Sequence, residues 1–269
     1  MPPTDWATLR EGRVIDLAQS WHRGMPVSPN HPAFQMALMR RHGDMVRPDG
    51  GSAANEMIVL GGHVGTHIDA LCHVSHEGLL HGGIETDPIT TNNGFTQLGI
   101  ETVPPFFCRG VLLDVARVHG VDHLPAGYEI TVSDLVAAQE ACGTELQPGD
   151  VALVHSGWNQ FWDDPEAFRG QIDGAPGPGE EAGNWLAQKK IRAAGAETIA
   201  FEVIRPGAGH STLPVHRQLL VESGIYIFEA MNLGQLATLD VGEFLFIASP
   251  LKLVGATGSP IRPLAIVFD

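Results

Sequence analysis

The sequence predicts an α/β protein in which outer helices cover a strand-rich core. Short apolar runs bounded by Gly, Pro or Asp recur along the chain, and segments with helical spacing lie between several of them. A chain of 269 residues fits one large domain or two small ones, but no internal repeat and no long polar linker divides it. We therefore expect a single domain over residues 1–269.

Eight apolar runs of four to six residues have the β-branched or leucine-rich composition of buried strands. Turn-forming residues flank most of these runs, as Gly149 and Asp150 do before the run at 151–154. The predicted strands cover residues 14–17, 57–60, 111–115, 151–154, 199–204, 225–228, 244–247 and 264–268.

Three segments have helical character, at residues 131–141, 180–194 and 212–223. The first opens on Thr131, a capping residue, and its apolar positions recur at helical spacing. The second begins with acidic residues and carries basic residues late, as the helix dipole favours. The third has Pro214 near its start and Gly224 as its stop signal. The irregular stretch at 163–179 is a candidate lid over a pocket.

The composition excludes several classes of function. Sixteen basic residues against thirty-one acidic ones give a net charge of −15, which argues against a nucleic-acid partner. Three cysteines without a C-x-x-C motif argue against a disulfide framework. The amino-terminal residues lack the pattern of a signal peptide, and no apolar run approaches the length of a membrane span. We therefore expect a cytoplasmic protein that binds neither nucleic acid nor membrane and acts on a small molecule.

Most of the chemistry is concentrated in eleven residues, His63-Val-Gly-Thr-His67-Ile-Asp69-Ala-Leu-Cys-His73. Two imidazoles and a carboxylate suit a divalent cation such as Zn²⁺ or Mn²⁺ and leave coordination positions open, as a catalytic site requires. We predict that His63, His67 and Asp69 are metal ligands. His73 then remains free of the metal to act as an acid or a base.

Other chemically capable residues give weaker signals. Cys72 lies inside the motif, but most free cysteines are small core residues, and packing is the favoured role. Ser156 lacks the G-x-S-x-G frame of a nucleophile, although its backbone is a candidate donor to a substrate carbonyl. Gly157 and Trp158 follow it, and the aromatic residues here suit core packing as well as a pocket for a flat ring. His210 is a loop histidine near His216 in the sequence.

The motif H-x-G-T-H-x-D-x-x-x-H resembles the signature of the metal-dependent cyclase-like hydrolases, the family that includes bacterial kynurenine formamidase and isatin hydrolase. Further segments resemble the family in the same order along most of the chain. They are Gly24-Met-Pro-Val-Ser-Pro-Asn-His-Pro32, Gly149-Asp-Val-Ala-Leu-Val-His-Ser-Gly-Trp158, Leu213-Pro-Val-His216 and Gly224-Ile-Tyr-Ile-Phe-Glu229.

The resemblance implies a cyclase-like (swivelling β/β/α) domain and gives roles to residues outside the main motif. His216 and Glu229 match the family residues that hold a second metal or support the catalytic histidine. The chain departs from the family at three places. The spacing of thirteen residues from His216 to Glu229 is one longer than in formamidase, Ala70-Leu71-Cys72 lacks the usual proline, and Phe201-Glu202 stands where an aspartate is expected.

The resemblance also implies assembly as a homodimer or homotetramer, in which pocket residues sometimes cross between subunits. Trp21 and Phe34 are the candidates for that role in this chain.

Together, the motif and the resemblance predict a metal-dependent amidohydrolase that acts on C–N bonds other than peptide bonds. Its predicted substrate is a small cyclic amide, isatin-like or lactam-like, or an aryl formamide, which metal-activated water attacks with His73 as the general base. The motif indicates the metal and the water, whereas only the resemblance implies the amide. The sequence leaves Mn²⁺ and Zn²⁺ equally open.

Three alternatives remain from the sequence. One is a lyase or cyclase on the same fold. Another is a non-haem Fe(II) oxygenase, because His67, Asp69 and a distant His216 satisfy the H-x-D…H pattern. The third is a non-catalytic metal-binding protein.

Overall fold

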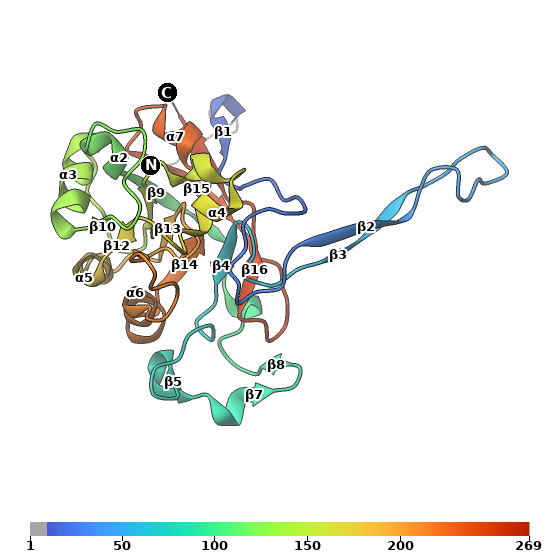
Figure 1. The fold of residues 1–269 in the computed structure, drawn as a ribbon, viewed down its shortest axis with the longest axis horizontal. Coiled ribbons are helices and arrows are strands. Elements are labelled where there is room, and N and C mark those ends of the chain that lie inside the picture. The colour runs from blue at the N-terminus through green and yellow to red at the C-terminus, as the bar shows by residue number, and fades with distance from the viewer. Residues whose placement is uncertain (1–9, 269) are drawn as a thin grey trace.

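A nine-stranded mixed sheet forms the centre of the protein, whose computed structural model describes residues 10–268 (Figure 1). Four neighbouring strands, β9, β11, β13 and β14, run parallel, and the strands on both sides of them pair antiparallel. In spatial order the strands are β1 (Arg13–Asp16), β17 (Leu264–Val267), β15 (Glu243–Ala248), β9 (Phe106–Asp114), β11 (Val151–His155), β13 (Ala193–Ala196), β14 (Tyr226–Glu229), β4 (His67–Asp69) and β16 (Gly258–Pro260).

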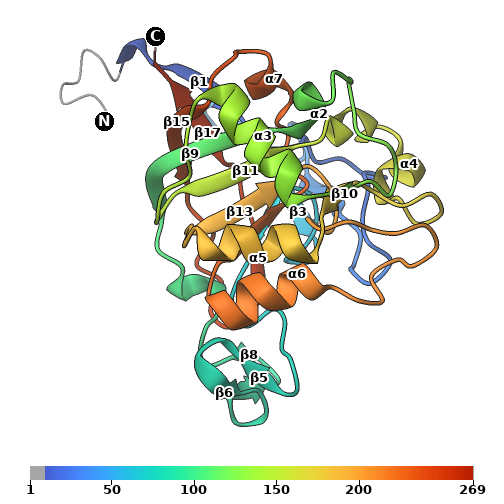
Figure 2. The same ribbon diagram turned by 90° about the vertical axis from the view of Figure 1, so that its left-hand side faces the viewer.

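Helices cover one face of this sheet, where α3, α5 and α6 lie across the strands (Figure 2). The helices are α2 (Val115–Val118), α3 (Val132–Cys142), α4 (Pro165–Arg169), α5 (Glu180–Gln188), α6 (Pro214–His216), the π-helical η5 (Arg217–Ser223) and α7 (Gly234–Ala237). Side chains of a strand alternate between its two faces, so Val111 and Leu113 pack under the helices while Leu112 joins the core on the other face.

Short elements complete the described chain. The 3₁₀ turns are η1 (His81–Gly83), η2 (Asp87–Ile89), η3 (Ile100–Thr102) and η4 (Trp158–Phe161). The two-stranded pairs join β5 (Leu79–Leu80) to β6 (Ile84–Glu85), β7 (Thr90–Thr91) to β8 (Gly94–Phe95), and β10 (Glu129–Ile130) to β12 (Gly177–Pro178). Within residues 10–268, no helix is both long and apolar enough to cross a membrane.

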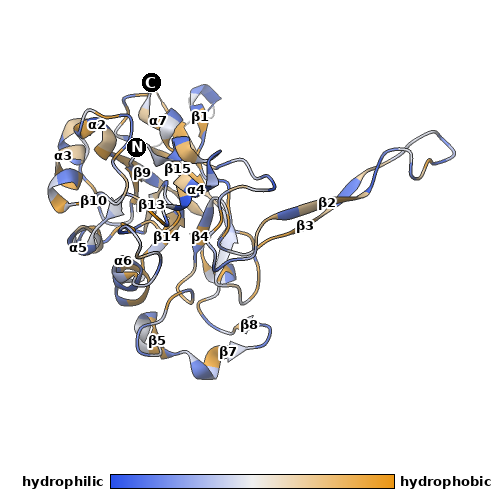
Figure 3. Ribbon diagram, viewed as in Figure 1, coloured by the Kyte–Doolittle hydropathy of each residue, from blue (hydrophilic) through white to orange (hydrophobic). Residues whose placement is uncertain are grey.

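A hairpin of β2 (Gln35–Arg40) and β3 (Asn55–Val59) projects far from this body (Figure 1). Every residue of both strands is exposed. Hydrophobic residues lie along the hairpin (Figure 3), and they include Met36, Leu38, Met39, Met57, Ile58 and Val59. We call residues 35–59 the arm.

The predicted α/β class, with a strand-rich core and outer helices, is confirmed, but several elements were wrong. Residues 199–204, predicted as a strand, form turns and bends. Within them only Ile204 makes a β-bridge, which joins it to Ala175. The strand predicted at 57–60 is present as β3, yet it is exposed and not buried. The helix predicted to reach residue 194 ends at Gln188, and Ala193–Ala196 is strand β13, which has no β-branched residue to reveal it. The stretch at 163–179 contains α4 and β12.

Candidate metal centre

Strand β4 places His67 and Asp69 on one face of the sheet, because residues two apart in a strand point the same way. Ile68 between them points to the opposite face and is fully buried in the core. The antiparallel neighbour β14 pairs Glu229 directly with His67. This register brings the carboxylate of Glu229 to the histidine motif although 162 residues separate it from His67 in the sequence.

His63 reaches the same place from the turn before β4. Its Nδ1 lies 2.7 Å from Asp69 Oδ1, and its Nε2 lies 2.8 Å from Thr257 Oγ1. Two glycines make room for this arrangement. Gly65 has a φ of +63°, and a Cβ there would lie 2.3 Å from Trp21 Nε1, while a Cβ on Gly258 would lie 2.5 Å from the ring of His63. The close packing therefore requires glycine at both positions.

The imidazoles of His67 and His216 are both held by Nδ1 and present Nε2 to the carboxylates. Nδ1 of His67 lies 2.8 Å from the carbonyl of Gly65, and Nδ1 of His216 lies 2.8 Å from Glu202 Oε1. Each Nε2 lies 3.1 Å from an oxygen of Glu229. Fixing one ring nitrogen by a hydrogen bond orients the other, which is how proteins hold a histidine that ligates a metal.

Three of the candidate metal-ligand atoms that meet here lack hydrogen-bond partners. His67 Nε2, Asp69 Oδ2 and Glu229 Oε1 are buried and lie outside hydrogen-bond geometry to any group of residues 10–268. Buried polar atoms are normally satisfied, so their convergence needs an explanation. Two groups place their ligand atoms within 4.8 Å of one another, namely His63, His67 and Asp69, and Asp69, His216 and Glu229. A divalent cation fits this set of nitrogen and carboxylate ligands.

The charges at the centre lead to the same conclusion. Burial by itself raises the pKa of Asp69, but His73 and His63 hold it well below its ordinary value. Burial and Asp69 raise the pKa of Glu229, yet the imidazoles of His216 and His67 beside it leave it lowered. Both carboxylates are therefore ionised side by side. Their negative charge is balanced either by protons on the imidazoles or by a cation that displaces those protons.

His73 stacks on His63 with 3.7 Å between ring centroids, and no ligand group includes it. Burial, opposed by Asp69 and helped by His63, lowers the pKa of His73 to about 4. The ring is therefore neutral at pH 7, which is the form that accepts a proton. The turn that carries it, closed by a hydrogen bond from His73 N to the carbonyl of Ala70, forms without the proline usual in the family.

The remaining departures from the family pattern also have a structural explanation. The helix after His216 is π-helical over Arg217–Ser223, and each i→i+5 bond spans one residue more than an α-helical i→i+4 bond, which suits the longer spacing to Glu229. Glu202 accepts hydrogen bonds from the backbone N–H groups of Val215 and His216 as well as pairing with the His216 ring. The local network around His216 is thus present.

Of the five residues predicted to line a substrate pocket, Trp21 and Phe34 pack against the site loop of their own chain. Their rings meet edge to face at 6.0 Å, and Trp21 lies against Gly65. Ser156, Gly157 and Trp158 lie beside Glu197 instead. The carboxylate of Glu197 accepts hydrogen bonds from Ser156 N, Ser156 Oγ and Trp158 N. The backbone of Ser156 is therefore not free to donate to a substrate.

No site role was predicted for Thr257 or His31, and Glu202 was noted only as a departure from the family pattern. Glu202 and Thr257 hold His216 and His63, and His31 stacks on His63 with ring centroids 5.4 Å apart. The only signal for His31 was its place in the segment at 24–32. The prediction for Cys72 agrees with its burial, which raises the pKa of the thiol to about 12 and makes a nucleophilic role unfavourable.

Comparison with known proteins assigns a family to this geometry. Residues 15–203 match the model of the family described as "Putative cyclase". Isatin hydrolase of Roseibium aggregatum is 29% identical over 222 residues, which cover 81% of this chain and 77% of the relative. Kynurenine formamidase of Delftia acidovorans is 26% identical over 252 residues, which cover 93% of this chain and 95% of the relative.

A solved structure described as a novel cyclase superposes on this chain with a TM-score of 0.86 and 30% identity, covering 97% of this chain and 91% of the other. The similarity therefore includes the arrangement of the whole described fold and not only the histidine motif.

Proposed function

This chain belongs to the cyclase family, as its motifs predicted, and from that premise we propose that it is a metal-dependent amidohydrolase. The proposed reaction opens a small cyclic amide or cleaves an aryl formamide. The names of two relatives, isatin hydrolase and kynurenine formamidase, support this range of substrates. The observation that carries the proposal is the convergence of unpartnered buried donor atoms beside the neutral ring of His73.

His63, His67, Asp69, His216 and Glu229 are the residues that would hold the metal, which we propose to be Mn²⁺ or Zn²⁺. A divalent cation in such a site lowers the pKa of a coordinated water and polarises a substrate carbonyl. Asp69 belongs to both ligand groups, so one ion or two can be accommodated by the same residues.

Residues around the centre orient the ligand side chains, and His73 transfers the proton. Thr257 holds Nε2 of His63 and Glu202 holds Nδ1 of His216, so the other ring nitrogen of each is oriented toward the ligand atoms. The neutral ring of His73 accepts a proton from the attacking water and then donates it to the departing nitrogen. The product is a carboxylate and an amine, or a ring-opened amino acid in the case of a cyclic amide.

The test is a panel of aryl formamides, isatins and lactams followed by ultraviolet absorbance, with Mn²⁺ or Zn²⁺ and with a chelator. Turnover that the chelator abolishes supports the proposal, and solvent oxygen-18 in the product separates hydrolysis from a lyase reaction. Folded, metal-loaded protein that is silent across the panel would overturn the substrate class. Turnover that requires dioxygen would favour the oxygenase instead.

We propose further that the protein works as a homodimer or homotetramer. The arm supports this, because an isolated two-stranded hairpin is marginally stable in water and this one exposes large apolar side chains along its length. The chain passes from β3 through residues 60–62 directly to His63, so the base of the arm lies next to the candidate metal centre in the sequence.

A further inference from the structure

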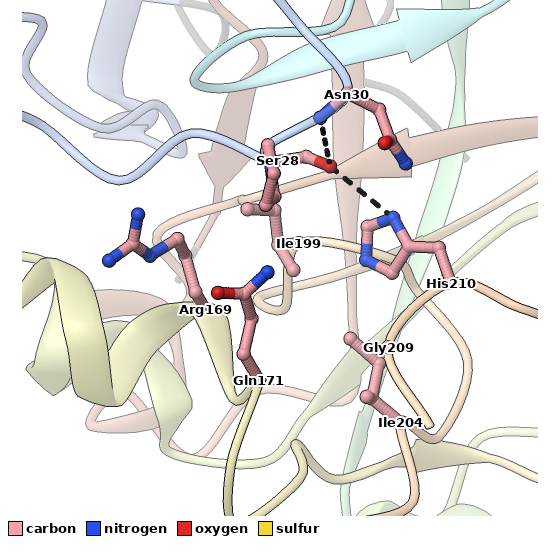
Figure 4. A pocket seen from close by; sticks show the side chains of 9 residues that line it. Ser28, Asn30, Arg169, Gln171, Ile199, Ile204, Gly209 and His210 are labelled. Atoms are coloured by element: carbon pink, nitrogen blue, oxygen red, sulfur yellow. Dashed lines mark hydrogen bonds between the residues drawn. The ribbon is translucent and has the colours of Figure 1, made fainter. Parts of the chain in front are cut away.

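A cavity of about 180 Å³ lies between three segments that are far apart in the sequence (Figure 4). Ser28 and Asn30 line it from the loop before the arm. Arg169 and Gln171 line it from the end of α4, and His210 lines it from the loop before α6. Each of the three segments thus contributes a polar side chain, among them the pair Ser28 Oγ and His210 Nδ1 at 3.4 Å, and Ile199 and Ile204 add an apolar part to the wall.

This cavity adjoins the candidate metal centre. Asn30 lines the cavity, and the next residue, His31, stacks on the metal-site histidine His63. His210 on the other wall is close enough to the centre that Glu229 and His216 both act on its pKa, which burial leaves lowered. A ligand whose reacting group lies at the metal centre therefore has this cavity within reach of a short side arm.

Arg169 is the unusual residue of the cavity wall. Its Nε is buried without a hydrogen-bond partner, and no carboxylate of residues 10–268 pairs with its guanidinium. The other described arginines are either bonded to protein oxygens or exposed, as Arg13 and Arg40 are. A partly buried guanidinium without an anion is costly, so a bound anion is the expected complement.

The rest of the wall favours an anion of a particular kind. No Asp or Glu lines the cavity, although acidic residues outnumber basic ones almost two to one in the whole chain. Asn30 and Gln171 add neutral amide groups. The volume corresponds to roughly six waters, enough for a carboxylate on a short carbon arm. A guanidinium also matches the planar carboxylate with two parallel hydrogen bonds.

We propose that this cavity is a subsite for a carboxylate carried by the substrate, with Arg169 as its anchor. The inference rests on the proposed amidohydrolase function and narrows its substrate to an amide that bears a carboxylate on a short arm. Arg169 is a specificity-determining residue and takes no part in bond breaking.

The first experiment measures binding without turnover. Metal-loaded, full-length protein is titrated with 3-phenylpropanoate and, separately, with neutral 3-phenylpropanamide, by calorimetry or by the fluorescence of Trp158 and Trp162, which contact Phe168 beside Arg169. The carboxylate binds at least about 10-fold tighter than the amide, and Arg169→Gln weakens carboxylate binding about 10- to 100-fold. Arg13→Gln, a change at an exposed arginine of β1, leaves binding unaltered.

Further variants separate recognition from folding. Gln171→Glu places a carboxylate beside Arg169 and competes with the ligand, so it weakens binding while Arg169 is intact. Arg169→Lys keeps the charge but loses the planar fork and gives an intermediate affinity. Because Arg169 has no partner to lose, Arg169→Gln leaves the melting temperature unchanged or higher. Equal affinity of wild type and Arg169→Gln for 3-phenylpropanoate, or inorganic sulfate binding as tightly as the carboxylate, would overturn the assignment.

The second experiment compares two N-formylanilines, one with a carboxyethyl arm and the other with its methyl ester. Arg169→Gln raises KM for the acid about 10- to 100-fold and leaves kcat/KM for the ester unchanged. An equal loss on both compounds would contradict a subsite role. If the wild type cleaves neither compound, hydrolysis of aryl formamides fails as the proposed reaction, and the binding comparison still decides whether Arg169 holds a carboxylate.

Discussion

Glu229 lies opposite His67 across the antiparallel pair of β14 and β4, with 3.1 Å between Glu229 Oε2 and His67 Nε2. The other oxygen of the same carboxylate lies 3.1 Å from His216 Nε2. One side chain therefore joins the histidine motif to the histidine of α6. The register of two strands, which no local motif expresses, completes the candidate metal centre.

Metal binding should stabilise the folded protein, because it relieves the unpaired carboxylates and imidazoles of the centre. We expect Mn²⁺ or Zn²⁺ at 100 times its Kd to add about 2.7 kcal/mol to the free energy of unfolding. Asp69→Asn should abolish the effect, since Asp69 belongs to both ligand groups, and the exposed change Glu140→Gln should not. Thermal melts with metal analysis measure it. An unchanged metal response in Asp69→Asn would count against the centre.

Glu202 is expected to act as a positioning residue through His216. In Glu202→Ala, His216 loses the acceptor that orients its ring, so metal affinity should fall about 10- to 100-fold. Two buried backbone N–H groups also lose their acceptor, which should cost roughly 2–4 kcal/mol of unfolding free energy. Titration with a competing chelator gives the affinity, and Glu181→Ala, at an exposed site, serves as the control. Unaltered metal affinity in Glu202→Ala would refute the positioning role.

The stability of the protein should depend on His155, which lies far from the histidine motif in the sequence. Burial by itself lowers its pKa, but the Glu197 carboxylate and the hydrogen bond with Asp114 at 2.7 Å raise it to about 9 from 6.5. The protonated ring therefore contributes about 3 kcal/mol below pH 6.5, and this is lost as the pH rises through 9. Urea unfolding between pH 6 and 10 should show the loss in wild type. The same dependence of the unfolding free energy on pH in His155→Gln would contradict the role of His155.

The arm should be covered by a second copy of the chain. Ile58→Asp and Met39→Glu place charges on its exposed apolar side chains and should shift the protein toward monomer, as light scattering coupled to size exclusion would show. Val121→Asp, at an exposed position of the body, is the matched control. A wild-type protein that is monomeric at micromolar concentration would refute the proposal that a second copy covers the arm.

Local patterns predicted the strands with β-branched residues and the three ligands within one motif, because both depend on neighbours in the sequence. β13 was missed since its alanines and glycine pack in the sheet through their neighbours' side chains and not through any strand propensity of their own. Glu202 and Thr257 were missed because they reach the site through the tertiary fold. The strand predicted at 57–60, which is β3 of the exposed arm, was misread as buried because its apolar pattern is that of a strand that packs on a partner.

Turnover of His73→Ala on an amide that the wild type hydrolyses, with the metal content of both proteins measured, is the most direct test of the proposed mechanism. We predict that kcat falls by about 10²- to 10⁴-fold while the bound metal is unchanged, because the ring accepts the proton but is outside the ligand groups. His76→Ala, at an exposed histidine three residues away, should retain full activity. Equal turnover of His73→Ala and wild type would contradict the assignment of His73 as the general base and, with it, the proposed mechanism.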